Sequence, residues 1–160
     1  MKYRGNTSIR YDKKSFTIQV VDGQGEELNA NLFGLRRDKI WVLDAMAVDR
    51  IRMRNRVNFD VWNAMSRVPY DTKLDRRNGT VGLFVELFIN GEYHGLYCFT
   101  DKVNRKLLDL KKPRVDDKGQ PTIRGVLYKG REWSSATRLR GYETDTTWQK
   151  KWNGWELAYP

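Results

Sequence analysis

The segment that most constrains the fold is residues 81–102, VGLFVELFINGEYHGLYCFTDK, because it has the pattern of a β-hairpin. Asn90-Gly91 separates two runs of strand-forming residues. Asn-Gly is typical of a type I′ turn, whose two central residues both need positive φ. A two-residue turn would place Glu86 opposite Gly95. Apolar residues occur on both faces, so we expect a central ribbon that is covered on both sides.

This hairpin carries charges that a purely structural ribbon does not need, namely Glu86 within one strand and Asp101-Lys102 at the exit. A buried carboxylate is costly unless it is paired. Two interpretations remain open. In the first, the hairpin lines a phosphate-binding cleft, with Asp101 and Lys102 at its rim. In the second, Glu86 forms an internal ion pair with an arginine of residues 50–56, and Arg54 is the first candidate.

The remaining segments predict a small number of strands and one long helix. Residues 15–20 alternate polar and apolar side chains, which is typical of a half-buried strand. Residues 40–49 are compact and apolar, and residues 125–130 resemble a short strand. Residues 111–122 contain two prolines and many charges, and they read as a mobile loop. The pattern therefore indicates an α+β chain with a mostly antiparallel sheet and one main helix.

The main helix is expected from about residue 50 to residue 66. Asp49 precedes it and is a plausible N-cap. Apolar residues then recur at every fourth position, which forms a stripe on one side of a helix. The members of this stripe are Met53, Val57, Val61 and Met65.

Length and charge limit the kinds of protein that this sequence can form. Its 160 residues are enough for a single domain or fragment, residues 1–160, with a hydrophobic core. A net charge of +10 attracts polyanions, although most surface charges are expected to be simply solvated. No apolar run approaches the length of a transmembrane helix. Cys98 is the only cysteine, and its position within a strand predicts a small buried side chain.

Common catalytic motifs do not occur in this chain. His94 is the only histidine, and we expect it to be an exposed hairpin residue. There is no P-loop, no glycine-rich dinucleotide loop and no zinc-ligand pattern. An autonomous enzyme is hard to build from the residues that remain. The cations that adjoin predicted strands are the best candidates for binding one anion, and they are Arg4, Lys13, Lys14, Lys102 and Lys129.

Six segments, taken in order, resemble the CotH kinase family, which includes the spore coat protein H proteins. They are RGNTS, KKSFTIQV, LFGLRRDKIWVLDAMAVD, MRN, VELFINGEYHGLYCFTDKV and GVLYKG, and the match that they mark out spans nearly all of residues 3–130. The hairpin segment is the most specific, because it fixes more than ten positions around one turn. The chain departs from the family pattern at Gln19, where lysine is frequent, and at Asp44, where asparagine is frequent.

The resemblance implies the nucleotide-facing amino-terminal part of a protein-kinase-like fold. Family members are described as atypical kinases that use ATP with Mg²⁺ or Mn²⁺ to phosphorylate serine in proteins. The family's catalytic aspartate and metal-binding segment are expected beyond Pro160, so the rest of the polypeptide is an expected partner and this chain alone is expected to be inactive. No catalytic or metal-binding residue is therefore assigned. The predicted nucleotide contacts are Arg4, Lys14, Lys102, Lys129 and Glu86, with Lys14 first.

Two other interpretations remain. The chain could be a non-catalytic, kinase-like module that mediates contacts in a spore coat, at a cell surface or in a secreted protein, locations that the family resemblance suggests. It could also bind nucleic acid, but only the charge supports this, because no RNA-binding motif or recognition helix is apparent. We therefore expect no specific nucleic-acid partner.

Overall fold

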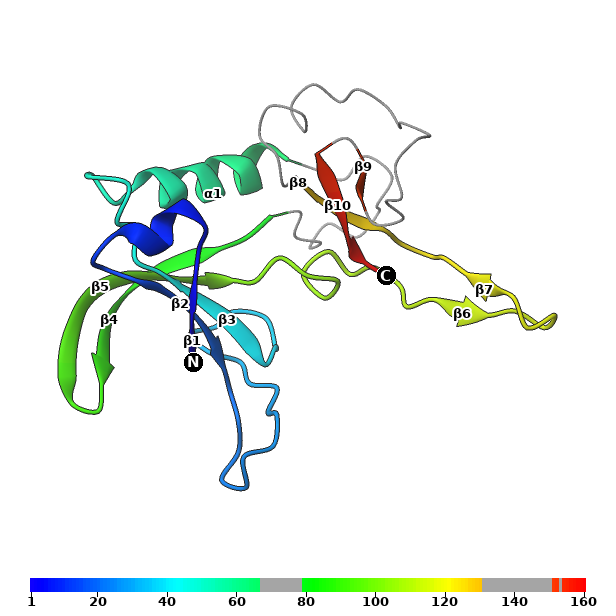
Figure 1. Cartoon of the computed structure of the whole chain (residues 1–160), viewed down its shortest axis with the longest axis horizontal. Coiled ribbons are helices and arrows are strands. Elements are labelled where there is room, and N and C mark those ends of the chain that lie inside the picture. The colour runs from blue at the N-terminus through cyan, green and yellow to red at the C-terminus, as the bar shows by residue number, and fades with distance from the viewer. Residues whose placement is uncertain (67–78, 131–150, 153) are drawn as a thin grey trace. The chain divides into compact units, whose positions relative to one another are not determined.

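The computed structural model describes residues 1–66, 79–130, 151–152 and 154–160. The chain forms two compact units, Met1–Val103 and Asn104–Pro160. The first unit contains a five-stranded sheet and the helix α1 (Figure 1). Its elements are β1 (Lys2–Arg4), the 3-10 helix η1 (Thr7–Arg10), β2 (Ser15–Gln19), β3 (Ile40–Asp44), α1 (Arg54–Met65), β4 (Gly82–Ile89) and β5 (Glu92–Asp101).

The order of strands in this sheet is β1-β2-β3-β5-β4, and all neighbouring strands are antiparallel. The chain leaves β3, passes through α1 and returns at the edge as β4, so that β5 fills the position between them. Helix α1 lies along one face of the sheet, as Figure 1 shows, and Asn63 donates a hydrogen bond to the carbonyl of Thr80 at 2.7 Å. The predicted α+β class, with a mostly antiparallel sheet and one main helix, is confirmed.

The hydrophobic core lies on the other face of the sheet. Trp41 is fully buried and stacks on Phe99, with 5.2 Å between the ring centroids. The other buried members of this cluster are Phe16, Leu35, Leu43, Ala45 and Tyr97. On β4, side chains alternate between this core and a more open face, where Phe84 and Phe88 are exposed. The expectation of a ribbon covered on both sides is therefore wrong, because one face of β4 is left exposed.

The hairpin between β4 and β5 has the predicted two-residue turn. Asn90 and Gly91 have φ values of 51° and 86°, and Ile89 pairs with Glu92 as expected. One additional residue in β5 then shifts the register, and Leu87 rather than Glu86 pairs with Gly95. The predicted Glu86–Gly95 pair is wrong. Gly95 has a φ of 91°, a conformation that permits this bulge and that glycine adopts without strain.

Helix α1 is confirmed, but it begins at Arg54 rather than near residue 50. Arg52 has a φ of 58°, which interrupts any helix that would start earlier. The carboxylate of Asp49 accepts the backbone N–H groups of Ile51 at 3.1 Å and of Arg54 at 2.9 Å. These contacts, the one from Arg54 foremost, lower the pKa of Asp49. Asp49 thus supports the helix start from the preceding turn.

The second unit contains a three-stranded sheet in the order β8-β10-β9 and a separate two-stranded ribbon. The strands are β6 (Arg114–Val115), β7 (Pro121–Thr122), β8 (Leu127–Gly130), β9 (Lys151–Trp152) and β10 (Trp155–Tyr159). Strand β8 confirms the short strand that was predicted from residues 125–130. The ribbon lies within residues 111–122, which were expected to form a loop. Its turn is closed by Asp116, whose carboxylate accepts the N–H groups of Lys118 and Gln120.

No helix among the described residues is both long enough and apolar enough to cross a membrane.

Candidate functional site

A row of side chains crosses the first sheet on the face that carries α1. Strand pairing places Arg4 opposite Ser15, Asp44 opposite Cys98, and Cys98 opposite Phe84. The hydroxyl of Ser15 donates to the carboxylate of Asp44 at 3.2 Å and joins the two halves of the row. Because side chains alternate along each strand, these residues share one face.

Asp44 is the centre of the hydrogen bonds in this row. Besides Ser15, its carboxylate accepts the backbone N–H of Met46 at 3.0 Å and the side-chain amide of Asn55 at 3.1 Å. The hydroxyl of Ser15 in turn accepts the N–H of Ala45 at 2.9 Å. Asp44 therefore links β2, β3 and the first turn of α1.

Lys13 lies next to this network, at the point where β3 ends. Its ammonium group donates to the carbonyl of Leu96 in β5 and lies 4.4 Å from the ring centroid of Tyr97. Burial lowers the pKa of Lys13, and the nearby charge of Arg52 lowers it further. Strand β3 lies between β2 and β5 in the sheet. Lys13, which precedes β2, contacts β5 directly because β3 has already ended at this point.

Lys14 has a different environment beside η1. Its ammonium group donates to the carbonyl of Ile9 at 2.9 Å and to the carbonyl of Tyr11 at 2.6 Å. An ammonium group has three donors, so one N–H of Lys14 remains for an anion. Lys14 is therefore held in place by backbone carbonyls, and no ion pair within the described residues neutralises its charge.

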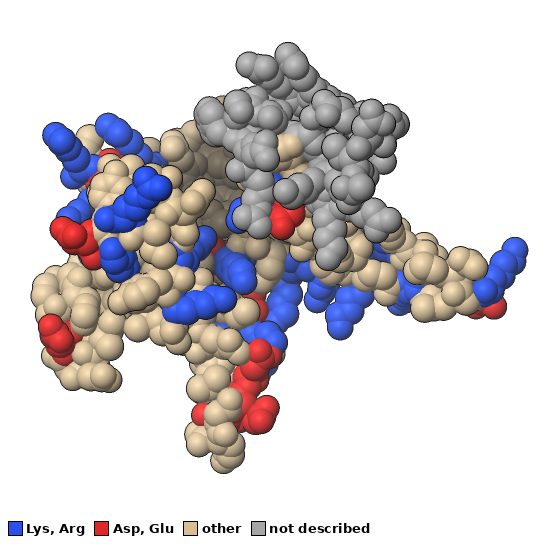
Figure 2. Space-filling model, viewed as in Figure 1, with Lys and Arg blue, Asp and Glu red and all other residues tan. Residues whose placement is uncertain are grey.

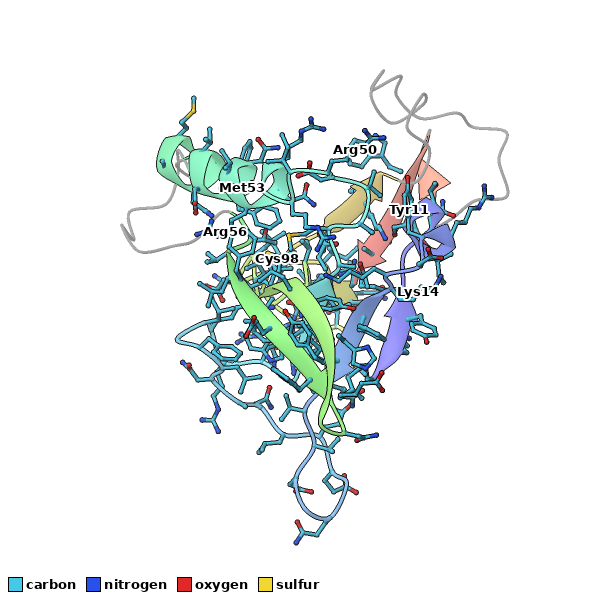
Figure 3. All side chains as sticks on the ribbon, turned by 90° about the vertical axis from the view of Figure 1, so that its left-hand side faces the viewer. Tyr11, Lys14, Arg50, Met53, Arg56 and Cys98 are labelled. Carbon is cyan, nitrogen blue, oxygen red and sulfur yellow. The ribbon has the colours of Figure 1, made fainter. Side chains whose placement is uncertain are left out.

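We define the basic surface as Arg4, Lys13, Lys14, Arg50 and Arg52. Figure 2 shows Lys and Arg side chains gathered over η1 and the start of α1. Figure 3 shows Tyr11 and Lys14 beside η1 and Arg50 on the loop before α1, on the same side of the unit. Within the described residues, the ion pairs use Arg36, Lys39, Arg54 and Arg56, and none uses a member of the basic surface. Such a set of cations attracts phosphate groups.

Of the predicted nucleotide contacts that belong to the first unit, the structure brings Arg4 and Lys14 together. Lys102 follows β5, where its carbonyl accepts a hydrogen bond from the guanidinium of Arg36 at 3.1 Å. Lys129 is exposed on β8 and belongs to the second unit. Sequence reasoning noted Lys13 among the cations but had no signal for its contact with β5.

Glu86 is exposed on β4 and is not buried as expected. Its carboxylate accepts a hydrogen bond from the hydroxyl of Tyr93 at 3.3 Å, within the same hairpin. The expected ion pair with Arg54 is wrong. The Nε atom of Arg54 lies 3.6 Å from the carboxylate of Asp49, and its side chain is 71% exposed. Glu86 lies on the uncovered face of β4 with Phe84 and Phe88, so it is exposed to water and needs no buried partner.

Asp101 has a structural role in the core and does not lie at the rim of a cleft as expected. Its side chain is fully buried and accepts a hydrogen bond from the Nε of Arg36 at 2.8 Å. The backbone N–H of Val81 approaches the other carboxylate oxygen at 3.3 Å. Arg36 also pairs with buried Asp38 at 2.5 Å, so one cation neutralises two carboxylates.

Cys98 is buried beneath α1, as predicted, and we expect it to be unreactive in the folded protein. Burial, with a smaller effect of the Asp44 charge, raises the pKa of its thiol to about 11. At pH 8 the thiolate fraction is then about a hundredfold lower than for a thiol with a pKa near 9.

We expect a disulfide reagent such as DTNB to label Cys98 slowly in buffer and rapidly in urea. Equal rates in the two solutions would contradict this placement.

The described residues are suited to binding the phosphates of a metal–nucleotide complex, but not its metal ion. The basic surface supplies ammonium and guanidinium groups, which are donors for phosphate oxygens. No group of three or more His, Cys, Asp or Glu side chains suited to a metal ion occurs among residues 1–66, 79–130 and the described residues after 150. Any metal-binding role for these residues is therefore not assigned.

Comparison with known proteins identifies the family of the chain. Residues 1–156 match the family described as CotH kinase protein. No curated protein and no solved structure matches the chain. The family match spans nearly the whole sequence and confirms the resemblance that the hairpin and the five other segments indicated. The chain belongs to the CotH kinase family.

Proposed function

We propose that this chain is the nucleotide-facing part of a CotH-type protein kinase that uses ATP with Mg²⁺ or Mn²⁺ and phosphorylates serine residues of a protein substrate. The observation that carries the proposal is the basic surface, whose five cations lie around the Asp44 network and form no ion pair within the described residues. Family membership supports the same activity. The arrangement also resembles the amino-terminal part of a protein-kinase-like fold, with a helix between the third and fourth strands of a five-stranded sheet.

The basic surface would hold the phosphates of the nucleotide. The guanidinium of Arg4 can contact phosphate oxygens with two parallel donors, and Lys14 adds the N–H that its backbone contacts leave over. ATP with its metal ion supplies the phosphoryl group, and the cations offset the charge of the phosphates. Lys102, Lys129 and Glu86 remain predicted contacts. The rest of the polypeptide and a serine-containing protein are the proposed partners.

We expect this chain to bind ATP with a dissociation constant in the millimolar range, or about −4 kcal/mol. Backbone amide NMR shifts during a titration with ATP and Mg²⁺ would measure this affinity. The shifts should cluster in η1, the first residues of β2 and the loop before α1. Arg4→Gln and Lys14→Met should each weaken binding several-fold. The matched control is Arg37→Gln, a change at an exposed arginine that donates to the carbonyl of Asn29.

Shifts confined to the turn of the β6–β7 ribbon, or no shifts, would argue against a nucleotide site in the first unit. Phosphate transfer to a serine-rich acceptor is a separate measurement. We expect none from the purified chain alone, and measurable transfer would overturn that part of the proposal.

A non-catalytic interaction module is the second candidate, and Gln19 favours it. The family frequently has lysine at this position, whereas the amide of Gln19 donates to the carboxylate of Glu27 at 2.7 Å. If the family lysine contacts phosphate, its loss weakens the nucleotide site. Gln19→Lys should then strengthen ATP binding in the same titration, and an unchanged affinity would remove this argument for the second candidate.

A further inference from the structure

Helix α1 turns its polar side toward the sheet. Asn55 donates to Asp44, and Asn63 donates to the carbonyl of Thr80. Phe59 also faces the sheet, since its ring lies 3.3 Å from where a Cβ of Gly82 would be. These positions are four residues apart, so they mark one side of the helix.

The apolar stripe of α1 occupies the opposite side. Met53, Val57, Val61 and Met65 are 49%, 47%, 49% and 79% exposed, and no residue of the helix is buried. An isolated helix of this length is marginal in water and relies on packing of its apolar face. A contiguous exposed apolar face on a soluble protein is typical of an interaction site.

Positive charge borders this stripe. At about 100° per residue, Arg54 lies on the same outer side of α1 as Val61, about two turns before it. Its Nε lies 3.6 Å from the carboxylate of Asp49, and its side chain is 71% exposed. Arg50 and Arg52 precede the helix, and neither takes part in an ion pair within the described residues. The nearest acidic side chain of the helix, Asp60, is already paired with Arg56. A complementary partner would therefore carry carboxylates beside apolar residues.

We infer that the outer face of α1 binds an acidic amphipathic helix of another protein. Apolar residues of the partner would cover the stripe, and its carboxylates would contact Arg54 and the arginines before the helix. Methionine and valine suit a peptide surface, because methionine adapts to varied partners. Helices that lie on membranes usually carry Trp, Phe or Leu on the apolar face.

Binding of designed peptides to the full chain tests the inference. The probe is a fluorescent peptide with leucine and glutamate at helical spacing, and the comparison peptides replace every glutamate with glutamine or with lysine. We expect the glutamate peptide to bind at least fivefold more tightly than the glutamine peptide, and the lysine peptide not to bind. Val61→Glu should weaken binding tenfold or more. The control is Val115→Glu on β6, an apolar position in the second unit that is 70% exposed, against 49% for Val61.

Arg54→Glu provides a second test that leaves the stripe intact, and it should reverse the preference between the glutamate and lysine peptides. Circular dichroism would establish that each variant folds. Equal binding of the three peptides, or an unchanged affinity of Val61→Glu, would overturn the inference. Binding to vesicles of phosphatidylcholine and phosphatidylserine without binding to the peptides would also overturn it. So would self-association that Val61→Glu abolishes, because a second copy would then be the occupant.

Discussion

Replacing Arg36 with methionine is expected to lower the free energy of unfolding by about 3–5 kcal/mol, because it removes the cation that donates to two buried carboxylates. Asp38 is 2% exposed and Asp101 is 3% exposed, and Arg36 donates to both. Both carboxylates are buried, so the loss of the charged donor is costly for them. A loss of this size is a large part of the stability of an ordinary domain, and the variant is expected to be partly unfolded at 37 °C.

Lys39→Met is the matched control for this change. Lys39 pairs with Glu27, but both side chains are well exposed, at 34% and 49%. Exposed ion pairs contribute about 1 kcal/mol or less. Urea unfolding followed by tryptophan fluorescence would measure both variants. If Arg36→Met and Lys39→Met lower the free energy of unfolding equally, the ion pairs of Arg36 with Asp38 and Asp101 do not stabilise the fold as we infer.

The elements that sequence alone predicted are those whose signals are local. Alternation in residues 15–20 and the Asn90-Gly91 turn depend on neighbouring residues, and both are confirmed. The pairing of Glu86 failed because a bulge shifts the register, and one glycine within a strand does not reveal how the chain will use it. The helix stripe was also visible in the sequence. Whether the stripe faces the sheet or the solvent could not be predicted, because helical periodicity identifies an apolar face but not the element that packs against it.

The candidate site was harder to predict because its parts are distant in sequence. Ser15, Asp44 and Asn55 come together only through strand pairing and the packing of α1. Lys13 and Lys14 are adjacent and chemically identical, and only the fold separates their roles. One contacts a carbonyl of β5, and the other holds the turn after η1. Asp101 was predicted to lie at the rim of a binding cleft, but it is a buried structural group that pairs with Arg36.

The second large effect is expected at Asp44, which holds three elements together. Asp44→Ala removes the acceptor for Ser15, Asn55 and the buried N–H of Met46. Hydrogen bonds to an ionised group are worth about 1.5–3 kcal/mol each and do not add fully, so we expect a loss near 3 kcal/mol. Asp44→Asn keeps one oxygen for Ser15 and Met46. The new amide N–H2 at position 44 can donate to the side-chain oxygen of Asn55 if the Asn55 amide flips. We therefore expect Asp44→Asn to lower the free energy of unfolding by only about 1 kcal/mol.

Asp44→Asn also tests the proposed nucleotide site without unfolding it. The aspartate places a negative charge among the cations that would contact phosphate, and removing it should strengthen the attraction for ATP. We expect roughly tenfold tighter binding, about 1.4 kcal/mol, in the NMR titration. The gain should shrink as KCl is raised, because salt screens charges at a partly exposed surface. A folded Asp44→Asn protein that binds ATP no more tightly would place the phosphates away from Asp44 and the basic surface around it.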